Sequence, residues 1–157
     1  MGDIRYLGTA GAGPLPLDRP HQIKVYGNYL MPLGLNIGLG VKVGSGTPLT
    51  ALAANPVYDN AGEIPMTPRG GGFNTEDGFR TRTPWLKQVD LHLDYNLHLG
   101  PRTLTLIGDA FNLFNTQTVT AYDNYTEVAF QTPNPDFGRR LAYQTPFQLR
   151  LGARFTF

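Results

Sequence analysis

The chain contains five stretches in which apolar and polar residues alternate with a period of two. In the clearest stretch, 88–99, every odd position is apolar and every even position is polar or charged. A β-strand directs successive side chains to opposite faces, whereas a helix would scatter these leucines around its circumference. Similar alternation occurs at 22–31, 35–44, 103–114 and 147–157. The pattern predicts five strands, each with one apolar and one polar face.

The stretch at 103–114 is the least regular of the five. Leu104 and Leu106 alternate with Thr103 and Thr105, but the alternation blurs over 107–110. We expect a β-bulge there, because an extra residue in one strand shifts the side chains that follow it to the other face.

The connections between the stretches alternate in length. Two are short turns, 32–34 and 100–102, whereas 47–84 and 116–145 are long and rich in Gly, Pro, Asn and Thr. Loops this long are unusual in a compact soluble domain, but outer-membrane barrels combine short periplasmic turns with long extracellular loops. The sequence therefore predicts an all-β fold, an antiparallel up-and-down transmembrane β-barrel segment with two long extracellular loops.

This topology gives each part of the chain an expected side of the membrane. With periplasmic turns the C-terminus is periplasmic, 1–20 is the remnant of an extracellular loop, and 21–157 supplies the strands and loops. The expected strands are 21–31, 35–47, 85–99, 103–115 and 145–157. Five strands do not close a barrel, and open edges in lipid leave backbone groups unpaired. We therefore expect the chain to be the C-terminal part of a larger, here incomplete, barrel.

Composition and charge narrow the function classes. The 157 residues include no cysteine, and 13 basic residues nearly balance 12 acidic ones. This excludes disulfide frameworks and thiolate metal sites and gives no reason to expect nucleic acid as a partner. No apolar run is long enough for a transmembrane helix, which leaves membrane-spanning strands open. The single serine, Ser45, does not stand in a Gly-x-Ser-x-Gly elbow, so we expect no nucleophilic hydrolysis, and no residue pattern of the chain points to a cofactor.

Four motifs in order along the chain carry a family resemblance. The end, 149–157, is similar to the terminal strand of Gram-negative outer-membrane barrels, and 109–115 resembles the Asn-Leu-Phe-Asn element of TonB-dependent receptor barrels. The segment 133–139 resembles the last extracellular loop of that family, and 18–21 with 44–48 resembles its Oar-like branch. The chain thus resembles the C-terminal barrel segment of a TonB-dependent outer-membrane receptor.

The resemblance implies a location in the Gram-negative outer membrane and a role in transport without catalysis. Its implied partners are outer-membrane lipid, the barrel-assembly machinery, the remainder of the barrel with its plug, and a transported ligand. In this family TonB acts through the plug, so energised transport is not expected of this chain alone. The implied assembly signal is the terminal apolar stripe, Leu149, Leu151, Phe155 and Phe157.

The polar positions of the strands are expected to face the barrel lumen. They include every charged or histidine residue of the regular stretches: Lys24, Lys42, Asp90, His92, Asp94, His98, Arg150 and Arg154. The two aspartates and two histidines that share 90–98 have a spacing at which a divalent metal is conceivable. Ion pairs with basic residues of neighbouring strands explain them better, so no metal is expected.

Aromatic residues in the two long loops are candidate ligand contacts, because exposed loop aromatics often contact ligands. Packing of the loops against one another would use the same residues. The candidates are Tyr58, Phe73, Phe79, Tyr122, Tyr125 and Phe137.

Two alternatives fit the same pattern. A soluble β-sandwich or lipocalin-like ligand-binding domain would bury the apolar faces in a core instead of lipid. A small outer-membrane β-protein would complete its barrel by oligomerising.

Overall fold

The computed structural model describes residues 12–157, which form two compact units. We call the first the sheet unit; it comprises His21–Gly44, Leu86–Gln117 and Gln144–Phe157. The second, the loop unit, comprises residues 12–20, Ser45–Trp85 and Thr118–Tyr143. In the part of the chain that is described, no helix is long and apolar enough to cross a membrane. Residues 1–11, part of the expected loop remnant 1–20, lie outside the described residues.

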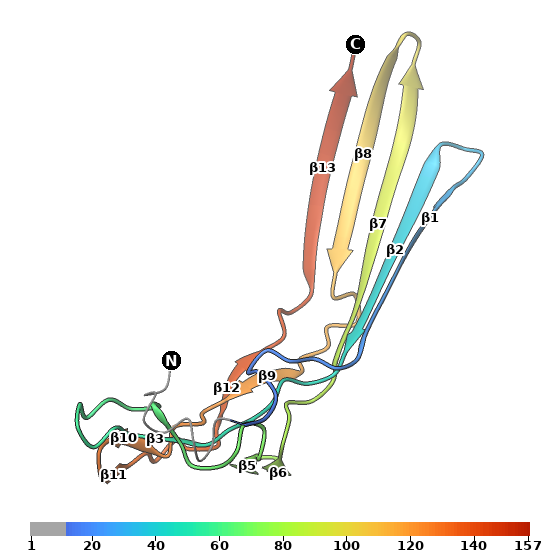
Figure 1. Cartoon of the computed structure of the whole chain (residues 1–157). Helices are drawn as coiled ribbons and strands as arrows, with labels where there is room; N and C mark the ends of the chain where they lie inside the picture. The colour runs from blue at the N-terminus through green and yellow to red at the C-terminus, as the bar shows by residue number, and fades with distance from the viewer. Residues whose placement is uncertain (1–11) are drawn as a thin grey trace. The chain divides into compact units, whose positions relative to one another are not determined.

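The sheet unit is one antiparallel sheet of five long strands in the order β1-β2-β7-β8-β13 (Figure 1). Each strand corresponds to one of the alternating stretches, which confirms the five predicted strands and the all-β class. Three strands differ from the expected bounds by three residues or more: β2 ends at Gly44, β8 ends at Phe111 and β13 starts at Gln148. The bounds are β1 Gln22–Leu30, β2 Leu35–Gly44, β7 Leu86–Leu99, β8 Arg102–Phe111 and β13 Gln148–Thr156.

The register keeps apolar positions opposite one another across the whole sheet. One row runs from Gly27 through Leu39, Leu91 and Ala110 to Leu149. Cross-strand neighbours of this kind are the unit of sheet stabilisation, and a slip by one residue would exchange the two faces of a strand. The alternation seen in single strands therefore becomes one continuous apolar face.

The predicted bulge at 107–110 is wrong. Pairing of β8 with both β7 and β13 runs through these residues without a register shift. The alternation blurred because Ile107 lies on the polar face, opposite Gly152, while Gly108 lies on the apolar face, opposite Leu93 and Leu151. The strand is therefore regular, and the alternation fails only because an isoleucine lies on the polar face and a glycine on the apolar face.

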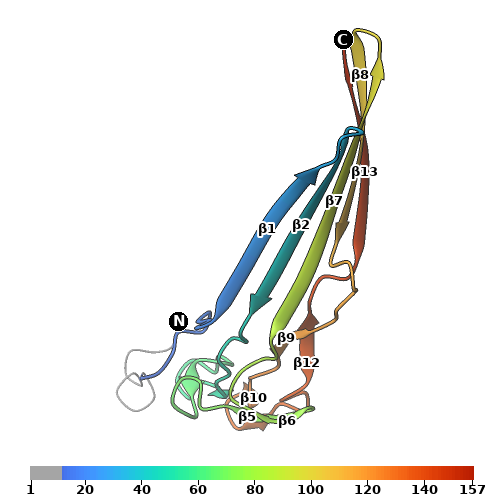
Figure 2. The ribbon, with the colours of Figure 1, turned by 90° about the vertical axis from the view of Figure 1, so that its right-hand side faces the viewer.

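Both short turns lie at the same end of the sheet, together with the end of β13 (Figures 1 and 2). In the first turn Gly34 donates to Met31 and Met31 donates to Leu35. Gly34 has φ +80° and Gly100 of the second turn has φ +66°, which is the left-handed region that glycine adopts at little cost. The segments 45–85 and 118–143 leave from the opposite ends of the strands.

The loop unit consists of short strand pairs, so the long loops are more structured than their composition suggests. It has four antiparallel two-stranded pairs. They are β3 Leu52–Ala53 with β4 Ile64–Pro65, β5 Phe73–Thr75 with β6 Gly78–Arg80, β9 Val119–Tyr122 with β12 Arg140–Tyr143, and β10 Glu127–Ala129 with β11 Thr132–Pro133.

A small core joins the two loops. Residues from both loops are buried in it, and Phe137 packs against them with its ring centroid 5.0 Å from that of Phe73. The backbones of the two loops also approach closely at Gly138, where a Cβ would lie 2.5 Å from the carbonyl oxygen of Asn74, so a residue without a side chain is needed there. The buried core residues are Leu49, Ala51, Phe73, Val119 and Tyr122.

Candidate functional site

The polar face of the sheet unit carries all eight charged or histidine positions singled out from the sequence. Lys24 lies on β1 and Lys42 on β2, four of the residues lie on β7, and two on β13. The register fixes which of them become neighbours, since residues directly opposite one another lie within contact distance. Three successive rows on this face hold Lys24, Lys42 and Gln88, then Tyr26, Gly40 and Asp90, then Asn28, Gly38, His92, Asp109 and Arg150.

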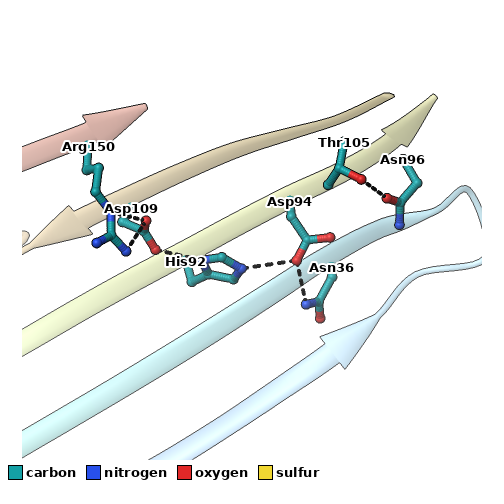
Figure 3. Close-up of polar contacts among 7 residues, drawn as sticks. All are labelled: Asn36, His92, Asp94, Asn96, Thr105, Asp109 and Arg150. Carbon is teal, nitrogen blue, oxygen red and sulfur yellow. Dashed lines mark hydrogen bonds and ion pairs between the residues drawn. The ribbon is translucent and has the colours of Figure 1, made fainter. Parts of the chain in front are cut away.

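A ladder of polar contacts crosses four strands on this face (Figure 3). Arg150 of β13 donates to Asp109 of β8 through Nε at 2.9 Å and Nη2 at 2.8 Å. Asp109 lies 2.6 Å from Nδ1 of His92, and Nε2 of His92 lies 3.0 Å from Asp94. Asn36 of β2 donates to the same Asp94 oxygen at 2.8 Å. The polar face thus cross-links β2, β7, β8 and β13 through side chains as well as backbone.

A glycine on the neighbouring strand makes room for His92 in this ladder. His92 is opposite Gly38 on one side and Asp109 on the other, and a Cβ at Gly38 would lie 3.1 Å from the Cβ of His92. Both imidazole nitrogens face a carboxylate, an arrangement in which the doubly protonated ring can donate at both positions. His92 therefore bridges the two aspartates through its two ring nitrogens.

A second polar group surrounds Asp90. Lys42 donates to this carboxylate at 3.0 Å and Gln88 at 2.8 Å, and the backbone N–H of Asn112 donates at 3.0 Å. The cations and carboxylates of the face are therefore largely paired within the sheet. Of the predicted residues, Lys24, His98 and Arg154 share the face but make none of the hydrogen bonds described for these two groups.

Between these groups the polar face is hollowed. A depression of about 390 Å³ lies over Gly38 and Gly40, where β2 contributes no side chain. Its other lining side chains are Tyr26, Asn28, Asp90, His92, Asp109 and Phe111. Among residues 12–157 no three His, Cys, Asp or Glu side chains are grouped as a metal site requires. Chemically, the face offers hydrogen bonds and balanced charge.

Asn112, in the predicted Asn-Leu-Phe-Asn element, is a further residue on which the site depends. It is 2% exposed and has φ +49°. Its amide nitrogen donates to the carbonyls of Thr116 at 3.0 Å and Thr145 at 2.8 Å, and its amide oxygen accepts from Thr116. This one side chain fixes where the chain turns out of β8 and where it returns toward β13.

The candidate loop aromatics divide into two groups. Phe73 and Tyr122 are buried in the loop-unit core, and Phe137 packs against it, so these rings hold the loops together. The other three have large exposed fractions: Tyr58 62%, Phe79 64% and Tyr125 44%.

Tyr122 also belongs to a polar cluster in the loop unit. Its hydroxyl donates to Asp77 at 2.5 Å, and Asp77 pairs with the guanidinium of Arg140. The hydrogen bond from Arg140, followed by that from Tyr122, lowers the pKa of Asp77 to about 2. Burial, followed by the bond to Asp77, raises the pKa of Tyr122 to about 12. The cluster ties β9 and β12 to the β5–β6 turn.

The terminal apolar residues lie where the alternation places them. Leu149, Leu151 and Phe155 share the apolar face with Leu91, and all three are exposed on β13. Phe157 follows the end of β13 and is 97% exposed.

Comparison with known proteins gives one informative similarity. No family model matches the chain, and no solved structure matches it. Among curated proteins, the TonB-dependent transporter Oar of Myxococcus xanthus is 30% identical over 195 aligned residues. The alignment covers 99% of this chain but only 18% of the transporter, so the chain spans less than a fifth of the length of this relative.

Proposed function

We propose that the chain is a wall segment of an outer-membrane TonB-dependent transporter. The observation that carries this proposal is the five-stranded sheet with one continuous apolar face and one charged face, in a chain similar along its length to such a transporter. The strands have 9 to 14 residues, and a membrane-crossing strand needs about 9 to 11.

The distribution of charge supports lipid as the environment of the apolar face. This face holds only two charged residues within its strands, Lys87 and Arg102, and they lie at opposite ends of the sheet, opposite Val43 and Leu99. A cation at the midplane of the lipid-facing side would cost about 2–4 kcal/mol, but near the interfaces it costs little. The apolar side chains between them stay exposed; Val25, for example, is 58% exposed.

In this proposal the remaining parts have defined roles. The polar ladder lines the lumen, the loop unit lies outside the cell, and the short turns and C-terminus are periplasmic. The stripe Leu149, Leu151 and Phe155, with Phe157, is the signal to the barrel-assembly machinery. The rest of the barrel would pair with the edges of β1 and β13, and its plug would lie inside the barrel. The chain contributes wall and ligand-facing loops and no catalysis.

A soluble sandwich is the less favoured alternative. It would need a second sheet to cover the apolar face, and within residues 12–157 the sheet unit contains one sheet only. A lipocalin-like barrel would need the sheet to close, but within the described chain β1 and β13 each pair with one neighbour.

Cysteine labelling tests the placement, because the chain has no native cysteine. We would express Phe79→Cys and Leu33→Cys, at side chains 64% and 83% exposed, in Gram-negative cells. A membrane-impermeant thiol reagent should label Phe79→Cys on intact cells and Leu33→Cys only after the outer membrane is permeabilised. Labelling of Leu33→Cys alone on intact cells, or recovery of both variants as soluble protein, would overturn the proposal.

A further inference from the structure

Two segments far apart in sequence form one end of the loop unit, which we call the loop tip: residues 51–66 and 123–134. The backbone N–H of Leu52 donates to Asn124 at 2.8 Å, and Leu52 accepts from Thr126 at 2.8 Å. The carboxylate of Asp59 accepts from the backbone N–H of Phe130 at 2.5 Å. The tip is therefore a single surface, fixed by backbone hydrogen bonds.

This surface exposes large apolar and aromatic side chains. Tyr125 lies across Gly62, where a Cβ would come within 2.4 Å of its ring, so the ring has a fixed position. Isolated exposed hydrophobic residues are normal, but several of them on two segments that are hydrogen-bonded together are typical of an interaction surface. The set and its exposed fractions are Val57 60%, Tyr58 62%, Met66 60%, Tyr125 44%, Val128 52% and Phe130 42%.

Charge is segregated at the tip. The stretches 48–68 and 116–138 contain five carboxylates and neither lysine nor arginine. One of the five, Asp136, pairs with Arg139. Other arginines of the loop unit pair outside the tip, Arg82 with Asp18 and Arg140 with Asp77. The four remaining carboxylates are Asp59, Glu63, Asp123 and Glu127.

Neutral donors hold these four carboxylates in place. Besides the bond of Asp59 to Phe130, Glu127 accepts from the N–H of Ala54 at 3.0 Å, and Glu63 accepts from Asn55 at 2.8 Å. Asp123 accepts from Asn134 at 3.1 Å. An ionised carboxylate has about four acceptor positions, so each has spare capacity for a further donor.

We propose that the loop tip is a docking surface for a cationic polypeptide segment. Aromatic faces beside carboxylates bind ammonium and guanidinium groups, through cation–π attraction and charge-assisted hydrogen bonds. The apolar side chains Val57 and Val128 would contact the aliphatic parts of the same segment. The inference rests on the proposed function for the exposure of the loops outside the cell, and it names the chemistry of the ligand that they meet.

A binding measurement on the full chain in detergent micelles tests the inference. The probe is a fluorescein-labelled peptide of alternating lysine and serine, and its matched control has glutamate in place of lysine. Fluorescence anisotropy should show binding of the lysine peptide only. The binding should weaken as salt rises from about 0.05 M to about 0.5 M, because screening shortens the reach of the carboxylates.

Variants locate the binding at the tip. Tyr58→Ser with Phe130→Ser should weaken the lysine peptide by about tenfold, which is about 1.4 kcal/mol. Asp59→Asn with Glu127→Gln should weaken it similarly, since an amide oxygen keeps the backbone hydrogen bond but removes the charge. The controls Leu141→Ser, at a side chain 62% exposed on β12, and Asp18→Asn, at a carboxylate paired with Arg82, lie in the loop unit outside the tip and should bind as the parent chain does.

Equal binding of the two peptides, or tip variants that bind as the controls do, would overturn the inference. Protease resistance of each variant, matched to the parent chain, shows that the loop unit still folds. The cysteine labelling above is read separately, so a failure of the membrane placement and a failure of the docking surface give different results.

Discussion

Asn112, directly after the end of β8, makes side-chain hydrogen bonds to two separate segments of the chain. Asn112 adopts φ +49° and its amide closes bonds to Thr116 and Thr145. Asn→Ala there removes these hydrogen bonds, each worth about 0.5–1.5 kcal/mol net, and leaves the carbonyls of Thr116 and Thr145 without this donor. We expect Asn112→Ala to lower the free energy of unfolding by about 2–4 kcal/mol, measured by urea titration in micelles.

Gln131→Ala is the matched control for Asn112→Ala. Gln131 also has positive φ, +59°, but it is exposed in the β10–β11 turn. We expect a change of less than about 1 kcal/mol for this control. Equal losses in the two variants would show that the backbone conformation of Asn112, and not its side-chain hydrogen bonds, determines the stability.

Single residues also show how far sequence alone could reach. The alternation placed His92 and Arg150 on a common face, but their link runs through Asp109, and pairing depends on a register that no single strand contains. Asp109 was not identified as a site residue because Ile107, two positions earlier, breaks the polar pattern. The alternation within one strand predicts the face on which a side chain lies, whereas its contact partner depends on the register with the neighbouring strand.

Among the elements, the strand pair β9–β12 carries Tyr122 and Arg140, which with Asp77 set the pH range over which their cluster stabilises the loop unit. Asp77 has its pKa lowered to about 2, so its contribution to stability is present above about pH 4 and is lost as the pH falls toward 2. Tyr122 has its pKa raised to about 12, so its contribution is present below about pH 10 and is lost as the pH rises toward 12. Between these limits the cluster is intact.

The variant Tyr122→Phe tests the alkaline limit, which depends on Tyr122, separately from the acid limit, which depends on Asp77. The variant should lose the late-ionising tyrosine, seen as one missing step near pH 12 in a tyrosinate absorbance titration. Destabilisation at acid pH should remain, because Arg140 still pairs with Asp77. Protease digestion of the loop segments across the pH range measures that acid limb. An unchanged absorbance titration in Tyr122→Phe would contradict the assignment of the late step to this residue.

The sequence predicts the long strands of the sheet unit well and the short strands of the loop unit poorly. The long strands follow from period-two alternation, which is local. The loop unit does not, because its core joins Phe73 with Val119 and its ties join Leu52 with Asn124. These pairs are more than 40 residues apart, and short strands of two to four residues leave too few positions for alternation to be seen. The composition of the loops was informative, but their packing was not encoded in any one segment.

For the whole molecule, the decisive property is the difference between the two faces of the sheet. Leu93 and Ile107 lie on adjacent rows of the sheet, since Ile107 pairs with Asp94, but they face opposite sides. Leu93→Arg would place a cation on the apolar face far from both ends, at a cost of about 2–4 kcal/mol in a bilayer. Ile107→Arg would place it beside Asp94, where a carboxylate is already present, so its cost should be below about 1 kcal/mol. Urea titration of the chain folded into lipid vesicles measures both. Similar losses in both variants, or a larger loss in Ile107→Arg, would mean that the leucine face does not meet lipid and that the two faces of the sheet have been assigned the wrong surroundings.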